Sequence, residues 1–205
     1  YAQSVHKRKE KMGLLLAEYI KQSSVLPVRV LNIACGSCRE IRELCLNDRA
    51  LVRKLDLTIL DQDPGALEFS KTELESTKVI PKLRCVQADV LALIRDTKRS
   101  LSNLGNQHLI YTIGLADYFP DRIFSKFVSL CFNLLATSGR CIIAHKDREA
   151  DQRAPLLPDW FCDWKFYPRN ERKVYDLIQK ASPKASIDVD RDSSERILFY
   201  TIIKV

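Results

Sequence analysis

The sequence of 205 residues has no uninterrupted apolar run that approaches the roughly 18 residues needed by a membrane-spanning helix. Its 3 histidines, His6, His108 and His145, lie far apart and lack the spacing of metal ligands. Internal repeats and low-complexity tracts are also absent. We therefore expect no membrane span and no metal site, in one domain whose 46% hydrophobic content is enough for a full core. Because the chain begins at Tyr1 and not at Met, a longer native chain is left open.

The 7 cysteines are an odd number and do not form the pattern of a disulfide framework, so a reducing, cytoplasmic setting is expected. Three lie inside apolar patterns and are predicted to be small core residues: Cys85, Cys131 and Cys141. Cys35 and Cys38 form C-G-S-C where a helix is predicted to begin, and a redox pair is one interpretation. No second C-x-x-C exists, and Ala34 precedes the first cysteine where a redox motif usually has an aromatic residue. We favour a turn of small residues.

The net charge is +7, and its densest part is a basic cluster at residues 6–11. A basic stripe is one sign of nucleic-acid binding. Elsewhere, however, basic residues are scattered among acids, and no RNA-binding aromatic motif occurs. We favour a solvated helix face and expect no nucleic-acid partner.

Segments with helical periodicity alternate along the chain with short apolar runs typical of buried strands. The predicted strands cover residues 28–33, 55–60, 83–87, 108–113, 140–144, 186–189 and 196–205. The predicted helices cover 4–22, 37–46, 64–77, 90–99 and 170–181, with one more that begins at residue 121. Gly139 is expected to close that helix as a left-handed residue, and the polar run 100–107 to form a loop.

This alternation predicts an α/β fold with a Rossmann-like, seven-stranded, mostly parallel sheet and helices on both faces. The last two strands form a hairpin, which adds an antiparallel strand. Residues 1–24 are predicted to be a helical extension and candidate lid, and residues 25–205 the main domain. Ligands of such sheets bind at the carboxyl ends of the strands, near the point where the strand order reverses.

Residues suited to a nucleotide follow three of these strands. The small residues of A-C-G-S-C, at 34–38, would let a ligand lie against the backbone beside the free N–H groups of a helix N-terminus. Asp61 ends the second strand, where a carboxylate can accept both hydroxyls of a ribose. Asp89 ends the third strand, where it can accept a hydrogen bond from an adenine amino group. Turn formation and helix capping are the alternative roles of both acids.

Over residues 28–205 the chain resembles class I S-adenosylmethionine-dependent methyltransferases. Their first motif, acid-x-G-x-G-x-G, corresponds to N-I-A-C-G-S-C, in which Asn32 replaces the acid, Ala34 the first glycine and Cys38 the third. L-T-I-L-D-Q-D-P-G-A-L and V-Q-A-D-V resemble the second and third motifs and contain Asp61 and Asp89. The resemblance implies S-adenosylmethionine as cofactor. The cofactor-binding residues that it implies are Asn32, Ala34, Cys35, Gly36, Asp61, Gln62, Asp89, Val90, Thr112 and Gly114.

Two further segments, I-Y-T-I-G-L-A-D-Y-F-P-D-R and D-W-K-F-Y-P-R-N-E, resemble a bacterial methyltransferase group. That group is assigned to the biosynthesis of an extracellular factor, the methyl ester of 3-hydroxypalmitic acid. The resemblance implies a small-molecule acceptor, methylated on a carboxylate or hydroxyl of a metabolite such as a hydroxy fatty acid. A carboxylate is ionised at pH 7 and needs no general base, whereas a hydroxyl needs one.

His145, just past the fifth strand, is the candidate general base, and a loop histidine bonded to the backbone is the alternative. Tyr118 is a second candidate catalytic residue that would orient the acceptor together with Asp117, and a packed ring is its alternative. Arg169 and the basic cluster are candidates for holding an anionic group of the acceptor. The aromatic residues expected either to wall the acceptor pocket or to pack in the core are Trp160 and Trp164.

Three other functions stay open on the sequence. A nicotinamide-dependent dehydrogenase is disfavoured because Ala34 and Arg39 stand where glycines of its G-x-G-x-x-G pattern belong. A methyltransferase for RNA or protein is compatible with the basic cluster, but G-L-A-D-Y stands where many amino-group methylating members have an N/D-P-P-Y-type tetrapeptide. The eroded glycine motif also allows a non-catalytic domain that binds the cofactor or a partner. A monomer or a homodimer is expected.

Overall fold

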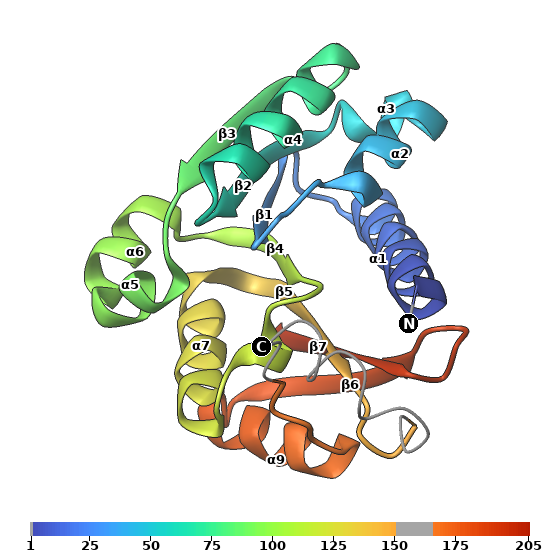
Figure 1. Ribbon diagram of the computed structural model, residues 1–205. Helices are drawn as coiled ribbons and strands as arrows, with labels where there is room; N and C mark the ends of the chain where they lie inside the picture. Colours follow the sequence, from blue (N-terminus) through green and yellow to red (C-terminus); the bar gives the residue numbers. More distant parts are fainter. Residues whose placement is uncertain (1, 151–165) are drawn as a thin grey trace.

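The computed structural model describes residues 2–150 and 166–205, with side chains from residue 4 onward. Its strands form one seven-stranded sheet in the order β3-β2-β1-β4-β5-β7-β6 (Figure 1). The strands are β1 (Val28–Ile33), β2 (Leu55–Asp61), β3 (Lys82–Gln87), β4 (Gln107–Thr112), β5 (Leu135–Lys146), β6 (Ala185–Arg191) and β7 (Ile197–Lys204). The first five pair in parallel, and β7 is antiparallel to both β5 and β6. The predicted fold class is confirmed.

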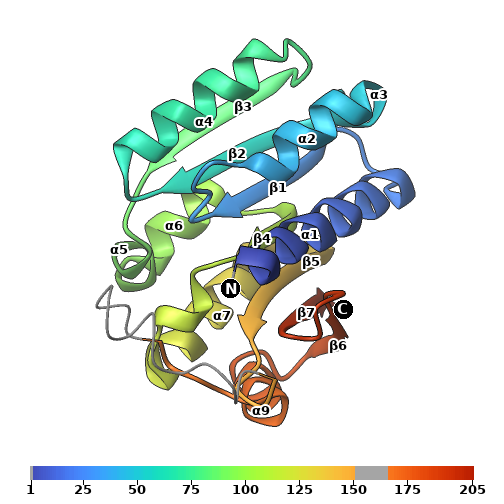
Figure 2. The same cartoon turned by 45° about the vertical axis from the view of Figure 1, so that its right-hand side comes forward.

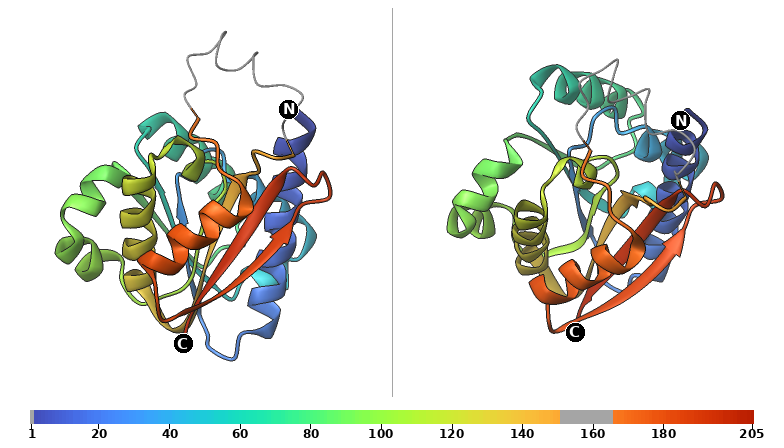
Figure 3. Two further views of the ribbon diagram at one scale, coloured as in Figure 1. Left: turned by 90° about the horizontal axis from the view of Figure 1, so that it is seen from below. Right: turned by 60° about the horizontal axis from the view of Figure 1, so that its bottom comes forward.

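Helices cover both faces of the sheet, and each group has its own apolar core. One face carries α1 (Ala2–Gln22), α2 (Arg39–Asn47), α3 (Arg49–Val52) and α4 (Pro64–Ser76). The other carries α5 (Val90–Arg95), α6 (Thr97–Leu104), α7 (Asp121–Leu134) and α9 (Glu171–Ala181). Seen from below, α1 lies on one side of the β6–β7 hairpin, and α7 and α9 lie on the other (Figure 3). None of the helices in the described ranges is long and apolar enough to span a membrane.

The N-terminal helix α1 packs beside α2 along the sheet (Figure 2). Its fully buried residues are Met12, Leu16 and Ile20. The Tyr19 hydroxyl donates to the carbonyl oxygen of His108 in β4 at 2.7 Å, and Lys11 pairs with Asp190 of β6. The apolar stripe of α1 therefore completes the core of one face, while its first turns extend toward the carboxyl edge of the sheet. Movement of α1 as a lid stays a prediction.

The structure corrects the prediction for residues 90–107. The expected single helix stops at Arg95 and a second helix, α6, covers most of the run expected to be a loop. Asp96 begins this second helix, because its side chain accepts a hydrogen bond from the Arg99 backbone N–H at 3.2 Å. Leu104 is buried at the other end of α6, so tertiary packing outweighs the polar composition of the segment.

Gly139 does not close α7, which ends at Leu134 where β5 begins. The left-handed residue is Ser138, with φ 60°. A Cβ on Gly139 would lie 2.9 Å from the carbonyl oxygen of Gln107 on β4. The carbonyl oxygen of Ala136 in β5 itself lies at the same distance, so close approach of backbone atoms from both strands, and not a positive φ, is what requires glycine here.

Cys85 is exposed on β3 and is not a core residue as predicted. β3 is an edge strand whose residues are exposed or half-buried, so alternation in its sequence does not place one face in the core. Cys131 and Cys141 are buried, as expected.

Candidate functional site

The candidate site lies at the carboxyl ends of the parallel strands. The chain moves outward from β1 to β2 and β3, then returns to β4 on the other side of β1. The strand order therefore reverses between β1 and β4, which is where open α/β sheets bind ligands. The turn after β1 and the loop after β4 both leave the sheet at this point.

The turn after β1 has an unusual backbone. Ala34, Gly36 and Cys38 have φ values of 55°, 52° and 46°, so every second residue is left-handed. These are the three glycine positions of the resembled motif, and two of them hold residues with a Cβ. A left-handed conformation at such a residue costs on the order of 1 kcal/mol. The turn thus keeps a glycine-type shape although two of its glycines are missing.

Asp61 holds this turn against the end of β2. Its Oδ2 accepts the Gly36 backbone N–H at 2.9 Å, and its Oδ1 accepts the Asp63 N–H at 3.1 Å. Ser70 of α4 donates its hydroxyl to the Gly36 carbonyl oxygen at 2.5 Å. A Cβ built on Gly36 would meet no atom within 4 Å, so open space lies against this backbone. The small-residue turn and the acid at the end of β2 are therefore neighbours, with room for a ligand beside them.

A buried polar network lies beneath the turn. Glu40, in the first turn of α2, is 5% exposed, and its Oε1 accepts the Tyr111 hydroxyl at 2.8 Å and the Asn32 amide N–H at 3.1 Å. Burial raises the pKa of Glu40 above its ordinary value. Sequence reasoning missed Glu40, although an acid on the apolar side of an amphipathic helix was a signal that could have found it.

Two buried polar atoms at this edge have no hydrogen-bond partner among the described residues: Asn32 Oδ1 and Thr112 Oγ1. They lie at the ends of the adjacent strands β1 and β4. Buried polar groups are nearly always paired in native proteins, and unpaired ones point to a missing ligand or water. Together with the open space at Gly36, they fit a nucleotide cofactor with polar groups, as expected for S-adenosylmethionine.

Asp89 and Val90 follow β3. The Asp89 Oδ1 accepts the Leu91 N–H at 2.9 Å and so caps α5, which was its alternative role. Its side chain is nonetheless 45% exposed, and an adenine contact stays a prediction. Val90 is buried in the core of the α7 face, and Gln62 is exposed beside Asp61.

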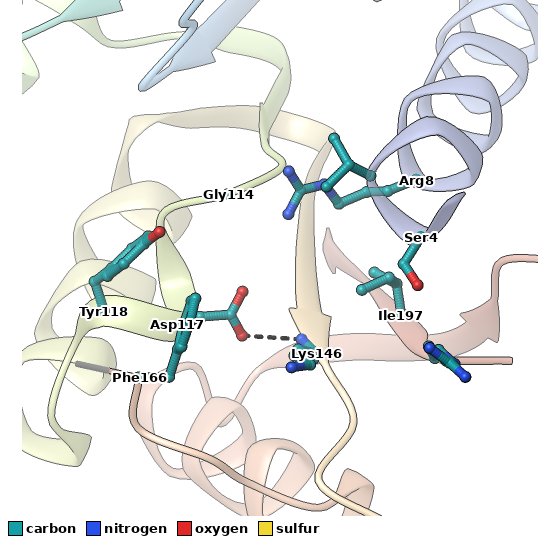
Figure 4. Close-up of a pocket in the computed structure, with 10 residues that line it drawn as sticks. Ser4, Arg8, Gly114, Asp117, Tyr118, Lys146, Phe166 and Ile197 are labelled. Atoms are coloured by element: carbon teal, nitrogen blue, oxygen red, sulfur yellow. Dashed lines mark hydrogen bonds between the residues drawn. The ribbon is translucent and has the colours of Figure 1, made fainter. Parts of the chain in front are cut away.

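A cavity of about 260 Å³ opens between the start of α1, the loop after β4 and the adjoining ends of β5 and β7 (Figure 4). Its lining includes three cations from distant parts of the sequence: Arg8, Lys146 and Arg196. Arg8 reaches from α1 toward Gly114, and a Cβ on that glycine would lie 3.3 Å from the Arg8 guanidinium. Arg8 belongs to the basic cluster, which was predicted to hold an anionic group of the acceptor, and the structure places it in the cavity lining. Lys146 and Arg196 were not predicted, because neither belongs to a sequence motif.

The lining of the cavity also contains two aromatic rings and one acid. The rings of Tyr118 and Phe166 lie 5.1 Å apart between centroids, and Lys146 Nζ lies 5.6 Å from the Phe166 centroid. Asp117 is the one acidic residue among the described lining residues. Its Oδ1 accepts the Lys146 backbone N–H at 2.9 Å. The structure thus brings the predicted pair Asp117 and Tyr118 together at one cavity.

His145 lies behind this cavity, with a side chain that is 0% exposed. Its Nδ1 donates to the Lys146 carbonyl oxygen at 2.7 Å and lies 3.3 Å from Asp117 Oδ1, while its Nε2 lies 3.0 Å from Arg169 Nη1. Burial, opposed by the nearby Asp117 charge, lowers the pKa of His145. The ring is therefore neutral at pH 7 and does not reach the cavity surface.

Arg169 is 3% exposed and does not line the cavity. Its Nε donates to Asp121 at 2.8 Å, its Nη2 donates to the Phe119 carbonyl oxygen, and its guanidinium lies 5.0 Å from the Phe124 centroid. These contacts join the loop after β4 to the start of α9. Trp160 and Trp164 lie outside the described residues. The described residues contain no group of three or more side chains suited to a metal ion.

No protein-family model and no curated protein matches the chain. Solved structures do match it. An O-methyltransferase family protein from Burkholderia thailandensis has a TM-score of 0.70 at 12% identity, covering 95% of this chain and 55% of that chain. Magnesium protoporphyrin IX methyltransferase from Synechocystis PCC 6803, with bound S-adenosylhomocysteine, has a TM-score of 0.71 at 11% identity, covering 97% and 84%.

A TehB-like S-adenosylmethionine-dependent methyltransferase from Corynebacterium glutamicum has a TM-score of 0.59 at 13% identity, covering 93% of this chain and 87% of that one. At such identities the likeness establishes the fold: the chain has the fold of these methyltransferases. The chain spans little more than half the length of the Burkholderia protein.

Proposed function

We propose that the protein transfers a methyl group from S-adenosylmethionine to a carboxylate of a small, partly apolar molecule. The observation that carries this proposal is the turn at residues 34–38. It keeps left-handed backbone at all three glycine positions, next to Asp61 and open space. Backbone strain of this kind clusters at ligand sites, so the left-handed Ala34 and Cys38 support a ligand at this turn. The shared fold with S-adenosylmethionine-dependent methyltransferases supports the choice of cofactor.

In this proposal the cofactor lies against Gly36, and Asp61 accepts its ribose hydroxyls. Asn32 and Thr112, whose unpaired oxygens lie at the switch point, offer hydrogen bonds to its polar groups. Asp89 is the proposed adenine contact. When bound, S-adenosylmethionine supplies a methyl group that its sulfonium already activates. The protein then has to hold the acceptor atom in line, within about 3–3.5 Å, and exclude water.

The acceptor pocket is the cavity between α1 and Asp117. Three cations in the cavity lining favour an anionic acceptor, and the Tyr118–Phe166 pair favours an apolar or aromatic body. A hydroxy fatty acid has both properties, as does any small aliphatic or aromatic acid. A cavity of about 260 Å³ suits a small molecule, or part of a longer one.

We prefer a carboxylate to a hydroxyl as the methyl acceptor because a hydroxyl would need a general base at the cavity. His145, the candidate general base, is covered by protein and does not line the cavity, so it is not placed to take a proton from an acceptor hydroxyl. An ionised carboxylate needs no proton removal before it attacks. We propose that His145 and Arg169 act as positioning residues, which hold the loop after β4 against β5 and α9.

Methyl-labelled S-adenosylmethionine tests this function directly. The protein is incubated with 3-hydroxy acids of increasing chain length and with their primary amides as matched neutral acceptors. We expect label in the acids alone, released as methanol by mild alkali, because alkali hydrolyses methyl esters but not methyl ethers or methylamines. Label that resists alkali, or that enters RNA or protein added as competitor, would overturn the assignment of a carboxylate acceptor.

A further inference from the structure

The C-G-S-C segment contains two thiols that the proposed methyl transfer does not use. Cys35 and Cys38 are the first and last residues of a tight turn, because the Cys38 backbone N–H donates to the Cys35 carbonyl oxygen at 3.0 Å. Cys38 is 1% exposed and Cys35 is 7% exposed, so only Cys35 offers any surface to solvent. Gly36, whose backbone N–H donates to Asp61 in the proposed cofactor site, lies between the two cysteines.

The turn brings the two cysteines to a separation that a disulfide can span. A turn closed by such a hydrogen bond keeps its first and last Cα atoms within about 7 Å. Disulfides join Cα atoms about 4.4–6.8 Å apart. The thiols also interact in the reduced protein, since a hydrogen bond with Cys35, followed by burial, raises the pKa of Cys38. Asn32 donates its amide N–H to Cys38 Sγ at 3.4 Å, which holds that sulfur in place.

We propose that Cys35 and Cys38 form a reversible disulfide that weakens cofactor binding, so that oxidation switches the protein off. This inference rests on the proposed cofactor site. A peroxide is the oxidant. The Cys35 thiol gives up its proton and attacks one peroxide oxygen, so that an S–O bond forms and the O–O bond breaks. Cys35 becomes a sulfenic acid, and the other oxygen leaves as hydroxide, which takes up that proton to become water.

Cys38 then attacks the Cys35 sulfur, so that the S–S bond forms and the S–O bond breaks. The departing hydroxide takes up the Cys38 thiol proton and becomes a second water. Two thiols lose two electrons in all, and hydrogen peroxide is reduced to two waters. A dithiol reductant reverses the reaction by thiol–disulfide exchange.

The disulfide would affect cofactor binding through the backbone of residues 36 and 37, which links the two cysteines. An S–S bond is about 2.05 Å long, much shorter than the contact of two thiols, so forming it draws the two sulfurs together and puts the turn between them under tension. Gly36 lies inside it, donating to Asp61 and accepting from Ser70. The flanking left-handed residues leave the turn little freedom to absorb the change. This tension displaces the Gly36 N–H from Asp61 and so disturbs the proposed ribose site.

The experiment uses a Cys85→Ser, Cys162→Ser background, which removes the thiol that is exposed among the described residues and the one cysteine that lies outside them, so that disulfides between molecules do not confuse the result. The protein is treated with hydrogen peroxide, mapped by mass spectrometry and titrated with S-adenosylhomocysteine before oxidation, after oxidation and after dithiothreitol. We expect a peptide linked through Cys35 and Cys38 that has lost two hydrogens. We expect affinity for S-adenosylhomocysteine to fall at least about tenfold, a change of about 1.4 kcal/mol, and to recover on reduction.

Two variants serve as controls. Cys35→Ser with Cys38→Ser should bind the ligand equally with and without peroxide. Cys131→Ser removes one member of the buried Cys131–Cys141 thiol pair and should leave the response intact. A map without the Cys35–Cys38 bond, or an oxidised protein whose affinity is unchanged, would overturn the switch. If the reduced protein binds no S-adenosylhomocysteine, the proposed cofactor site fails, and the peptide map still decides whether the disulfide forms.

Discussion

The backbone N–H of Gly36 donates to the Asp61 carboxylate at 2.9 Å, and this contact joins the turn after β1 to the end of β2. A second contact, from Asp63 N–H, fixes the other carboxylate oxygen. The acid is thus held beside the backbone that would cradle a nucleotide, with both oxygens oriented before any ligand arrives. Such pre-organisation lowers the entropy lost on binding.

Replacing Ala34 by glycine should stabilise the protein. Ala34 has φ 55°, a conformation that glycine adopts without a Cβ penalty. The gain in the free energy of unfolding should be about 0.5–1 kcal/mol, after allowance for the greater entropy of the unfolded glycine chain. Ala17→Gly in the middle of α1 is the matched control and should lose a similar amount. Urea denaturation measures both, and a loss of stability in Ala34→Gly would contradict the strain assigned to the turn.

Glu40 should make stability depend on pH. Burial raises its pKa in the folded protein above the value of 4.5 that an exposed glutamate has. Between those two pKa values the native state binds a proton that the unfolded state has lost, so the free energy of unfolding falls as pH rises through this window. Glu40→Gln keeps an acceptor for Tyr111 and Asn32 but cannot ionise.

We therefore expect Glu40→Gln to gain stability relative to the wild type as pH rises from 4.5 to 8, with the curves converging at low pH. Denaturation at a series of pH values measures the difference. A difference that does not vary with pH would mean that Glu40 titrates as an exposed carboxyl.

His145 should behave as a positioning residue. Loss of a general base lowers the rate by about 10²–10⁴-fold. His145→Asn, whose amide N–H can still donate toward the Lys146 carbonyl oxygen, should retain methyl transfer within about tenfold and lose about 1–3 kcal/mol of stability. A pH–rate profile is the decisive readout: the variant should keep the wild-type profile. A rate loss of the larger size, with the acid limb of the profile abolished, would restore His145 as the base.

Arg196 should contribute to acceptor binding and not to cofactor binding. Arg196→Gln removes one of the three cations of the cavity and should raise KM for a carboxylate acceptor about tenfold, as expected for one charge-assisted hydrogen bond. Lys126→Gln, on the exposed surface of α7, is the charge-matched control and should leave KM unchanged. Equal KM values for the two variants would remove Arg196 from the acceptor site.

Much of the fold was predictable because strands buried on both faces and helices with one apolar face leave strong patterns in the sequence. The N-terminal boundary of α4 is one example, since the helix begins at Pro64 as predicted, and Asp63 caps it. Where prediction failed, tertiary contacts decided the outcome. Packing made α6 a helix despite its polar residues, and the approach of Gln107 explains Gly139.

Some residues of the candidate site were likewise predictable from the sequence, and others were not. Motif residues such as Asp61 could be placed from sequence, because strand ends of a parallel sheet meet at one edge. The cavity cations could not, since Arg8, Lys146 and Arg196 come from a helix, a strand end and a hairpin whose meeting depends on the whole fold. His145 and Arg169 had suitable chemistry for direct roles, but burial, which the sequence does not show, covers both.

The most direct measurement is calorimetric titration of the reduced protein with S-adenosylmethionine and S-adenosylhomocysteine, with NAD as the competing nucleotide. Asp61→Ala is the test variant, and Asp63→Ala, which removes a neighbouring carboxylate that caps α4, is its control. We predict binding of both sulfur nucleotides and none of NAD, with Asp61→Ala weaker by about 1.5–3 kcal/mol and Asp63→Ala unchanged. Wild-type affinity in Asp61→Ala, or a folded protein that binds NAD instead, would contradict the cofactor site proposed for this turn.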